Sequence, residues 1–110
     1  MQRRTVLTGL VAAVAATSLV PSNRAMAGRV HQIEIRDFAF VPTRLKVAPG
    51  DEVTWINRDV VPHTATASDE SWDTGSLDQG QSTTLTIAEG MQARYFCRFH
   101  PSMVAELVIG

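Results

Sequence analysis

Three side chains that bind soft metals lie within seven residues of one another near the C-terminus. Cys97, His100 and Met103 follow at steps of three in the run YFCRFHPSM. Cys97 is the only cysteine of the chain, so an internal disulfide cannot protect its thiol. A metal would hold this sulfur as a thiolate and would also stabilise a small domain. The spacing therefore predicts a metal site around Cys97.

The chemistry of these ligands favours copper. A thiolate is soft and an imidazole is borderline, and together with a thioether they suit copper better than any hard cation. Copper electron-transfer sites combine two histidines and one cysteine in a trigonal arrangement with a weak axial methionine. The run supplies one histidine, so a second must come from elsewhere in the chain.

Two other histidines are available, His31 and His63. His31 falls at the start of the first expected strand. His63 follows Val60-Val61-Pro62, just after a turn at Asn57, and so falls at a strand end, where the connecting loops of a sandwich meet. We therefore expect His63, rather than His31, to complete the ligand set.

Each of these residues also has a simpler interpretation. A buried lone cysteine is most often a small hydrophobic residue, His63 could be a solvated loop residue, and Met103 could fill the core. Zinc accepts cysteine and histidine as well, and a copper carrier or storage protein could use the same ligands. Cys97 and His100 could act as nucleophile and base, but no third residue that would orient them is apparent, so we expect no enzyme.

The elements that must position these residues are short strands. Apolar and polar residues alternate with a period of two, turn signals separate the alternating segments, and helical patterns are nearly absent. The alternating segments are residues 33–36, 44–47, 53–55, 84–87 and 106–109. This pattern predicts an all-β fold, a Greek-key β-sandwich in which two antiparallel sheets pack face to face.

The metal-binding run is expected where two such strands meet. One strand ends at Cys97, with Tyr95 and Cys97 on the same inward face. Residues 98–103 are expected to form the following turn, broken by Pro101, and the last strand is expected to start at Val104. This arrangement places the three candidate ligands at one end of the sandwich.

The first 27 residues have the layout of an export signal. Arg3 and Arg4 precede an apolar run over residues 6–20, and Ala25-Met26-Ala27 supplies a small-x-small cleavage site. The arginine pair resembles a twin-arginine signal, which implies bacterial export. We expect cleavage after Ala27, a single domain over residues 28–110 and a periplasmic location.

The charge of residues 28–110 argues against one class of partner. This part of the chain holds all eleven acidic residues but only seven of the ten basic ones, which gives a net charge of −4. A nucleic-acid binder normally shows a basic patch, so we expect no nucleic-acid partner. We also expect the mature form to be a soluble monomer. The acidic run at Asp69, Glu70, Asp73 and Asp78 either steers a basic partner or is a solvated loop face.

The segments around the candidate ligands resemble the cupredoxins, the small blue copper proteins. Residues 97–103 are similar to their metal-binding loop, and the two-residue gaps on both sides of His100 resemble the short loop of the amicyanins. Upstream, residues 38–67 have a Phe-x-Pro opening, a Pro-Gly-Asp turn and a Val-x-Trp-x-Asn strand. Pro62-His63 then stands where the first copper ligand of the family belongs. The resemblance covers nearly all of residues 28–110.

The resemblance implies a type 1 (blue) copper site in which one ion cycles between Cu(I) and Cu(II). The implied ligands are His63, Cys97, His100 and Met103, the last of them axial and long. His100 would reach an apolar surface, formed here by Phe99 and Pro101, and pass one electron to a docked protein. The implied redox partners are a dehydrogenase such as methylamine dehydrogenase as donor and a c-type cytochrome as acceptor.

Two residues beside the ligands are expected to tune the site. Directly after the first histidine the amicyanins have an asparagine that helps to brace the ligand loops, whereas this chain has Thr64. A threonine is shorter, so we expect a looser brace and an altered reduction potential, although the Thr64 N–H could still donate to the Cys97 sulfur. Arg98 is expected to raise the potential, because its charge disfavours the oxidised, more positive site.

Overall fold

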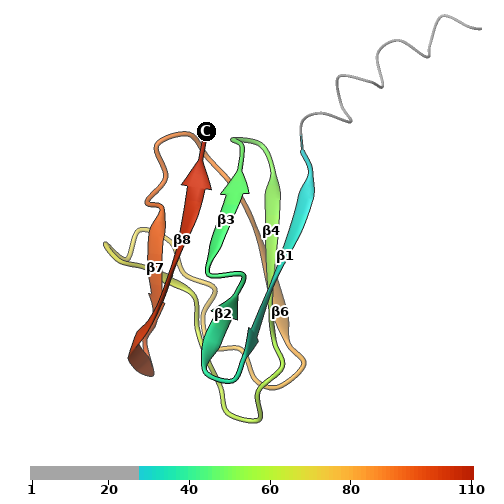
Figure 1. The fold of residues 1–110 in the computed structure, drawn as a ribbon, viewed down its shortest axis with the longest axis vertical. Helices are drawn as coiled ribbons and strands as arrows, with labels where there is room; N and C mark the ends of the chain where they lie inside the picture. Colours follow the sequence, from blue (N-terminus) through green and yellow to red (C-terminus); the bar gives the residue numbers. More distant parts are fainter. Residues whose placement is uncertain (1–27) are drawn as a thin grey trace, which may run out of the picture.

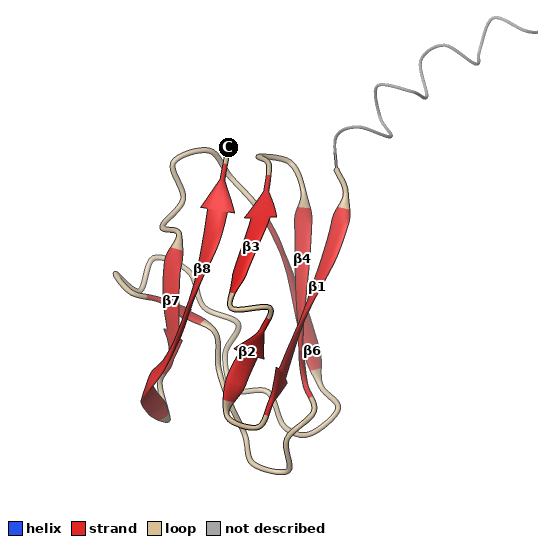
Figure 2. Cartoon of the chain, viewed as in Figure 1, coloured by secondary structure: helices blue, strands red, loops and turns tan. Residues whose placement is uncertain are grey.

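The computed structural model describes residues 28–110, which form a sandwich of two four-stranded sheets without any helix in this range (Figures 1 and 2). The sheets have the strand orders β2-β1-β4-β6 and β3-β8-β7-β5. The strands are β1 (Val30–Arg36), β2 (Ala39–Val41), β3 (Arg44–Val47), β4 (Glu52–Asn57), β5 (Thr66–Ala67), β6 (Ser82–Thr86), β7 (Arg94–Cys97) and β8 (His100–Ile109). The all-β sandwich predicted from the alternation is confirmed.

Both sheets are mixed, although we expected antiparallel ones. β1 runs parallel to β4 and β3 runs parallel to β8, whereas the other neighbours are antiparallel. The cause is the path of the chain. After the β1–β2 hairpin it crosses to the second sheet for β3 and then returns beside β1 for β4, so β1 and β4 run in the same direction.

The alternating apolar residues meet between the two sheets. Residues that are at most 1% exposed include Ile33, Ile35, Val53, Trp55, Tyr95, Cys97 and Leu107. Tyr95 packs edge-on against Phe40 and Trp55, with ring centroids 4.7 and 5.6 Å apart. Burial of one large aliphatic or aromatic side chain contributes roughly 1.5–3 kcal/mol, so this core holds the frame from which the loops extend.

The sequence pattern misses two short strands. β2 has three residues and β5 has two, which is too few for a period of two to be visible. Both residues of β5 are buried, so this strand shows no alternation at all. Its pairing with β7 nevertheless matters, because β5 continues the loop that follows His63.

The last hairpin is tighter than we expected. The turn contains Arg98 and Phe99, and β8 begins at His100, whereas we placed the whole of residues 98–103 in the turn. His100 therefore lies at the start of a strand, directly opposite the end of the preceding one.

A bulge explains how β8 accommodates a proline. Cys97 pairs with His100, while Phe96 pairs with Val104. The residues of β8 between these two pairs have no counterpart in β7 and bulge away from the ladder. Pro101 lies in this segment, where its missing N–H costs no ladder hydrogen bond.

The opposite end of the sandwich, at the top of Figure 1, is closed by the loop between β3 and β4. The Asp51 carboxylate accepts hydrogen bonds from the backbone N–H groups of Ala48 and Arg29, at 3.0 and 3.1 Å. Nε2 of His31 lies 2.8 Å from the same carboxylate. One side chain therefore ties this loop to β1.

The expected export signal and its cleavage after Ala27 lie outside the described residues. Over residues 28–110 no helical segment is long and apolar enough to cross a membrane.

Candidate metal centre

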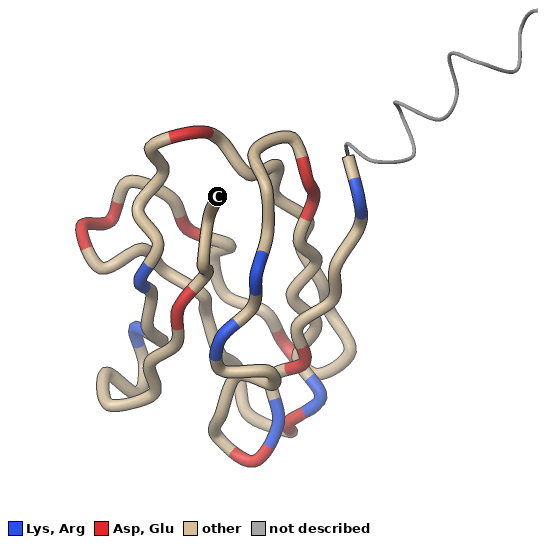
Figure 3. The backbone as a smooth tube through the Cα atoms, turned by 45° about the horizontal axis from the view of Figure 1, so that its top comes forward, with Lys and Arg blue, Asp and Glu red and all other residues tan. Residues whose placement is uncertain are grey.

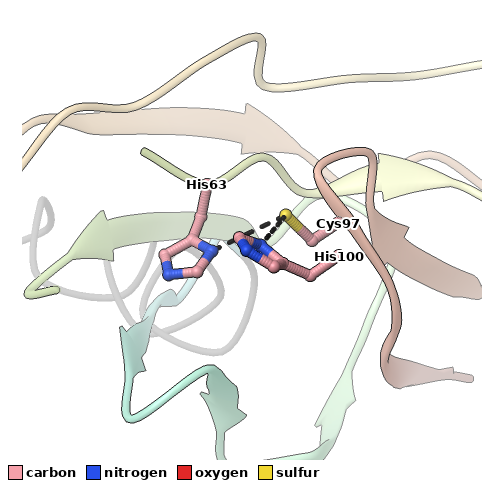
Figure 4. Close-up of side chains that lie close together, drawn as sticks. All are labelled: His63, Cys97 and His100. Carbon is pink, nitrogen blue, oxygen red and sulfur yellow. Dashed lines mark hydrogen bonds between the residues drawn. The ribbon is translucent and has the colours of Figure 1, made fainter. Parts of the chain in front are cut away.

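The side chains of His63, Cys97 and His100 converge at one end of the sandwich (Figure 4). Cys97 ends β7, His100 starts β8, and His63 lies in the loop between β4 and β5. Their metal-binding atoms all lie within 4.8 Å of one another. Sγ of Cys97 is 3.6 Å from Nδ1 of His63 and 3.8 Å from Nδ1 of His100.

The loop that carries His63 is held by backbone and amide hydrogen bonds. The main chains of His63 and Leu77 exchange two hydrogen bonds, at 3.1 and 2.8 Å. Nδ2 of the fully buried Asn57 donates to the carbonyl groups of Val61 and Leu77, each at 2.8 Å. The Val-x-Trp-x-Asn pattern seen in the sequence thus ends on a residue that positions this histidine.

Burial divides the three side chains. Cys97 and His63 are fully buried, whereas His100 is partly exposed. The sulfur is therefore shielded from solvent oxidants, and the histidine of β8 is the group through which the site meets the surface.

Asp59 determines which nitrogen of His63 faces the sulfur. Nε2 of His63 lies 2.8 Å from Oδ2 of Asp59, and because a carboxylate can only accept, Nε2 carries the proton. The other ring nitrogen, Nδ1, then faces Sγ of Cys97 and is available as a metal ligand. Burial disfavours the charged form of Asp59, but hydrogen bonds from the Phe38 and Asp37 N–H groups and from His63 outweigh it and lower its pKa.

Phe38 packs edge-on against both histidine rings. Its ring centroid lies 5.3 Å from that of His63 and 4.9 Å from that of His100. Its backbone has a φ of 58°, and the two hydrogen bonds to Asp59 hold this turn in place. Sequence reasoning did not single out Asp59 or Phe38. The only available signal was a carboxylate four residues before the candidate histidine.

Thr64 connects the two loops of the site. Its N–H donates to Sγ of Cys97 at 3.4 Å. Its Oγ1 accepts from the N–H of Arg98 at 2.9 Å and lies 2.9 Å from Oγ1 of Thr66. The threonine hydroxyl, although shorter than an asparagine side chain, therefore reaches the opposite loop at an ordinary hydrogen-bond length.

The Arg98 side chain is paired with acidic groups. Its Nε lies 3.3 Å from Oδ2 of Asp73, and its terminal nitrogen lies 3.7 Å from Glu70. Burial raises the pKa of Asp73, but hydrogen bonds from the Gly75 N–H, Thr66 and Arg98 outweigh this effect, and the net pKa is lowered. Two residues of the expected acidic run are thus engaged with Arg98 rather than free to face a partner.

The structure places the remaining predicted residues as follows. Met103 lies in the bulged part of β8, is 6% exposed and belongs to the core cluster, and its axial role stays a prediction. Phe99 is 51% exposed and Pro101 is also exposed. His31 is held by Asp51 at the other end of the sandwich and is not brought to the site.

The sequence matches the model of a known family over nearly all of the described residues. That family comprises the copper-binding proteins of the plastocyanin/azurin type, and the match covers residues 27–110. The chain belongs to this family. Copper, the cofactor expected from the ligand chemistry, is confirmed as the metal of the family, and the expected cupredoxin fold is confirmed as well.

Individual relatives of this cupredoxin include amicyanins. Amicyanin from Paracoccus denitrificans is 28% identical over 82 residues, which covers 70% of this chain and 63% of that protein. This chain thus spans less than two thirds of the length of that relative. The reduced state of an amicyanin mutant is 30% identical with a TM-score of 0.63, covering 76% of this chain and 82% of that one. These matches agree with the amicyanin-like loop in the sequence.

A further match supports the fold. A purple cupredoxin from Nitrosopumilus maritimus has a TM-score of 0.65 and 24% identity, and covers 73% of this chain and 99% of that one. Nearly all of that cupredoxin therefore has a counterpart here.

The donor atoms of this cupredoxin fit a single transition-metal ion. An ion bonded to nitrogen at about 2.0 Å and to sulfur at about 2.3 Å, with an angle of about 120°, separates the two atoms by about 3.7 Å. The observed distances from Cys97 to His63 and His100 are 3.6 and 3.8 Å. One thiolate and two imidazoles at this spacing suit copper.

Proposed function

We propose that this cupredoxin is a periplasmic electron carrier whose type 1 copper ion is bound by His63, Cys97, His100 and, at a longer distance, Met103. The proposal depends above all on one observation, the approach of two imidazole nitrogens to the buried cysteine sulfur at 3.6 and 3.8 Å. Copper supplies one-electron chemistry by cycling between Cu(I) and Cu(II).

The residues around the ligands hold them in place. Asp59 fixes the tautomer and orientation of His63, and the Thr64 N–H donates to the sulfur of Cys97. Cys97 and His100 are also paired across the hairpin. A site whose ligands are held by surrounding hydrogen bonds rearranges little between its two redox states, which favours fast electron transfer.

The electron leaves and enters through His100 in this proposal. His100 is partly exposed, and Phe99, Pro101 and Phe38 place exposed apolar groups near it. A small apolar surface suits the weak encounters typical of redox partners. We propose no catalytic activity for the chain itself.

Several of the exposed charges of the molecule are paired. Basic and acidic residues are interspersed over the molecule in Figure 3. Arg36 and Arg58 both contact Glu34, and Arg44 contacts Glu106, at 3.1–3.4 Å. Such exposed pairs contribute little to stability, but each of them neutralises part of the surface charge near it.

The likeness to amicyanin supports a proposal for the partners and the compartment. We propose a dehydrogenase such as methylamine dehydrogenase as donor and a c-type cytochrome as acceptor. The expected signal at residues 1–27 supports export to the periplasm, where the mature chain would act as a soluble monomer.

A copper titration tests the proposal. With Cu(II), the protein is expected to absorb visible light strongly through its copper–thiolate bond and to show a reversible one-electron wave. Cys97→Ser is expected to abolish the absorption. Copper binding without colour would instead indicate a carrier or storage protein, and zinc found in protein purified from its host would contradict the copper assignment.

A further inference from the structure

A ring of hydrogen bonds joins the two loops that carry the proposed ligands. Oγ1 of Thr66 donates to Oδ1 of Asp73 at 2.9 Å, and Oδ2 of Asp73 accepts from Nε of Arg98 at 3.3 Å. The backbone N–H of Arg98 donates to Oγ1 of Thr64 at 2.9 Å. Oγ1 of Thr64 lies 2.9 Å from Oγ1 of Thr66, which closes the ring.

The chemistry of the groups determines the direction of each hydrogen bond. The Asp73 carboxylate can only accept, so the single hydroxyl proton of Thr66 points to it. Oγ1 of Thr66 can then only accept, so the hydroxyl of Thr64 donates to Thr66. Oγ1 of Thr64 is left to accept from Arg98. The hydrogen bonds that run from the Arg98 N–H through Thr64 and Thr66 to Asp73 therefore all point in the same direction. Successive hydrogen bonds in such a chain strengthen one another.

The ring is anchored at both of its hydroxyl groups and at its carboxylate. Thr64 and Thr66 are 2% and 0% exposed, and a buried hydroxyl that loses its partner is costly. Asp73 pairs with Thr66 through a β-bridge, and its Oδ1 also accepts from the Gly75 N–H at 2.9 Å. The carboxylate is thus fixed although its side chain reaches the surface.

We propose that Thr66 and Asp73 are positioning residues of the copper site. Neither of them is a proposed ligand, and they act through Thr64 and Arg98. The ring fixes Thr64, whose N–H donates to Sγ of Cys97, and it holds Arg98 at the start of the turn that leads to His100. This inference rests on the ligand set given under the proposed function.

The ring is expected to keep the reduction potential high. A hydrogen bond to the sulfur stabilises its negative charge, which is larger when the site is reduced. A Thr64 N–H that is held less firmly would therefore favour the oxidised form.

Two variants of Thr66 test the ring without a change of charge. Thr66→Val removes the hydroxyl and keeps the shape, whereas Thr66→Ser keeps the hydroxyl. In copper-free protein we expect amide hydrogen exchange at Arg98 to be about twofold to tenfold faster in Thr66→Val, the factor that loss of about one net hydrogen bond implies. With copper bound, the potential of this variant should be lower. Thr66→Ser should keep both the exchange rate at Arg98 and the reduction potential close to those of wild type.

Asp73→Ala opens the ring at its exposed member, so it also serves if Thr66→Val fails to fold. Asp78→Ala is the matched control, because it removes the same charge from an exposed position of the same loop. Faster exchange at Arg98 in Asp73→Ala but not in Asp78→Ala supports the proposal.

Wild-type exchange and potential in Thr66→Val, or equal effects of the two aspartate variants, would overturn the proposal. The exchange measurement needs no copper. A wild-type protein that stays colourless with copper would therefore refute the ligand set while the exchange data still report on the ring.

Discussion

At the scale of single residues, Asp59 has the largest expected effect on metal binding without being a proposed ligand. It accepts from Nε2 of His63 and thereby leaves Nδ1 free to face the sulfur. Loss of the carboxylate that orients a ligating histidine typically lowers metal affinity by about 10–100-fold. We expect Asp59→Ala to lower copper affinity within this range, measured by competition with a chelator of known affinity.

The control for this variant is Asp69→Ala. Asp69 is an exposed acidic residue whose carboxylate accepts hydrogen bonds from the N–H and hydroxyl groups of Ser71. It therefore reports the effect of losing one negative charge alone. Equal copper affinities for the two variants would show that Asp59 does not orient His63.

Arg98 bears on the reduction potential rather than on affinity. Its positive charge disfavours the oxidised site, but Asp73 and Glu70 share that charge. We expect Arg98→Ala to lower the potential, measured by voltammetry, and Arg98→Lys to lower it less because the charge remains. A potential in Arg98→Ala that is unchanged or higher would refute this role.

At the scale of elements, β8 supports both the core and the metal loop. Leu107 is fully buried, whereas Val104 on the same strand is 58% exposed. Truncation of a buried leucine costs about 2–5 kcal/mol, and an exposed substitution usually costs less than about 0.5 kcal/mol. We therefore expect Leu107→Ala to lower the free energy of unfolding by about 2–5 kcal/mol and Val104→Ala to change it little, as measured in urea.

The comparison of these two positions also tests the strand register. If Val104→Ala were the more destabilising variant, the inward face of β8 would be assigned wrongly. That face includes Met103, whose proposed axial role depends on the same register.

Sequence reasoning recovered the strands that have a visible alternation and the three residues that converge on the site. Alternation and the spacing of Cys97 and His100 are local features, whereas His63 was inferred from its position at a strand end and from the family resemblance. It missed the parallel pairs, since strand order depends on where the chain crosses between sheets. It also missed Asp59 as a partner of Phe38, because the two residues are 21 positions apart and meet only in the folded chain.

The Cys97 hairpin shows the same limit. The sequence predicts a turn over residues 98–103 broken by Pro101, but it does not indicate that β8 already begins at His100 and that Pro101 lies in a bulge inside this strand. The role of Thr64 is similar. Its hydroxyl was expected to brace poorly, and its partners Thr66 and Arg98 become visible only in the folded structure.

At the scale of the whole molecule, the two ends of the sandwich are stabilised by different means. The proposed metal and its ligands hold one end, whereas Asp51 holds the other. Asp51 is only 3% exposed. Its carboxylate joins the loop after β3 to Arg29, which directly precedes β1, and to His31, which lies within β1. The stability of the far end should therefore depend on pH even when copper is absent.

The sign of this dependence follows from the pKa of Asp51. The hydrogen bond with His31, followed by those from the Ala48 and Arg29 N–H groups, outweighs the effect of burial and lowers that pKa below its ordinary value of 3.8. A carboxyl group with a lowered pKa in the folded state stabilises the protein above its unfolded pKa. This contribution is lost as the pH falls below 3.8 through the folded pKa.

Urea unfolding of copper-free protein at several pH values tests this expectation. Asp51→Asn should unfold at lower urea concentrations than wild type at pH 7. Below pH 3.8 the margin should shrink, because the wild-type carboxyl group becomes protonated and neutral like the amide. Asp78→Asn, at an exposed loop position, is the control for a general charge effect and should show no such convergence. A margin between wild type and Asp51→Asn that stays constant down to pH 2 would mean that the charge of Asp51 does not close this end of the sandwich.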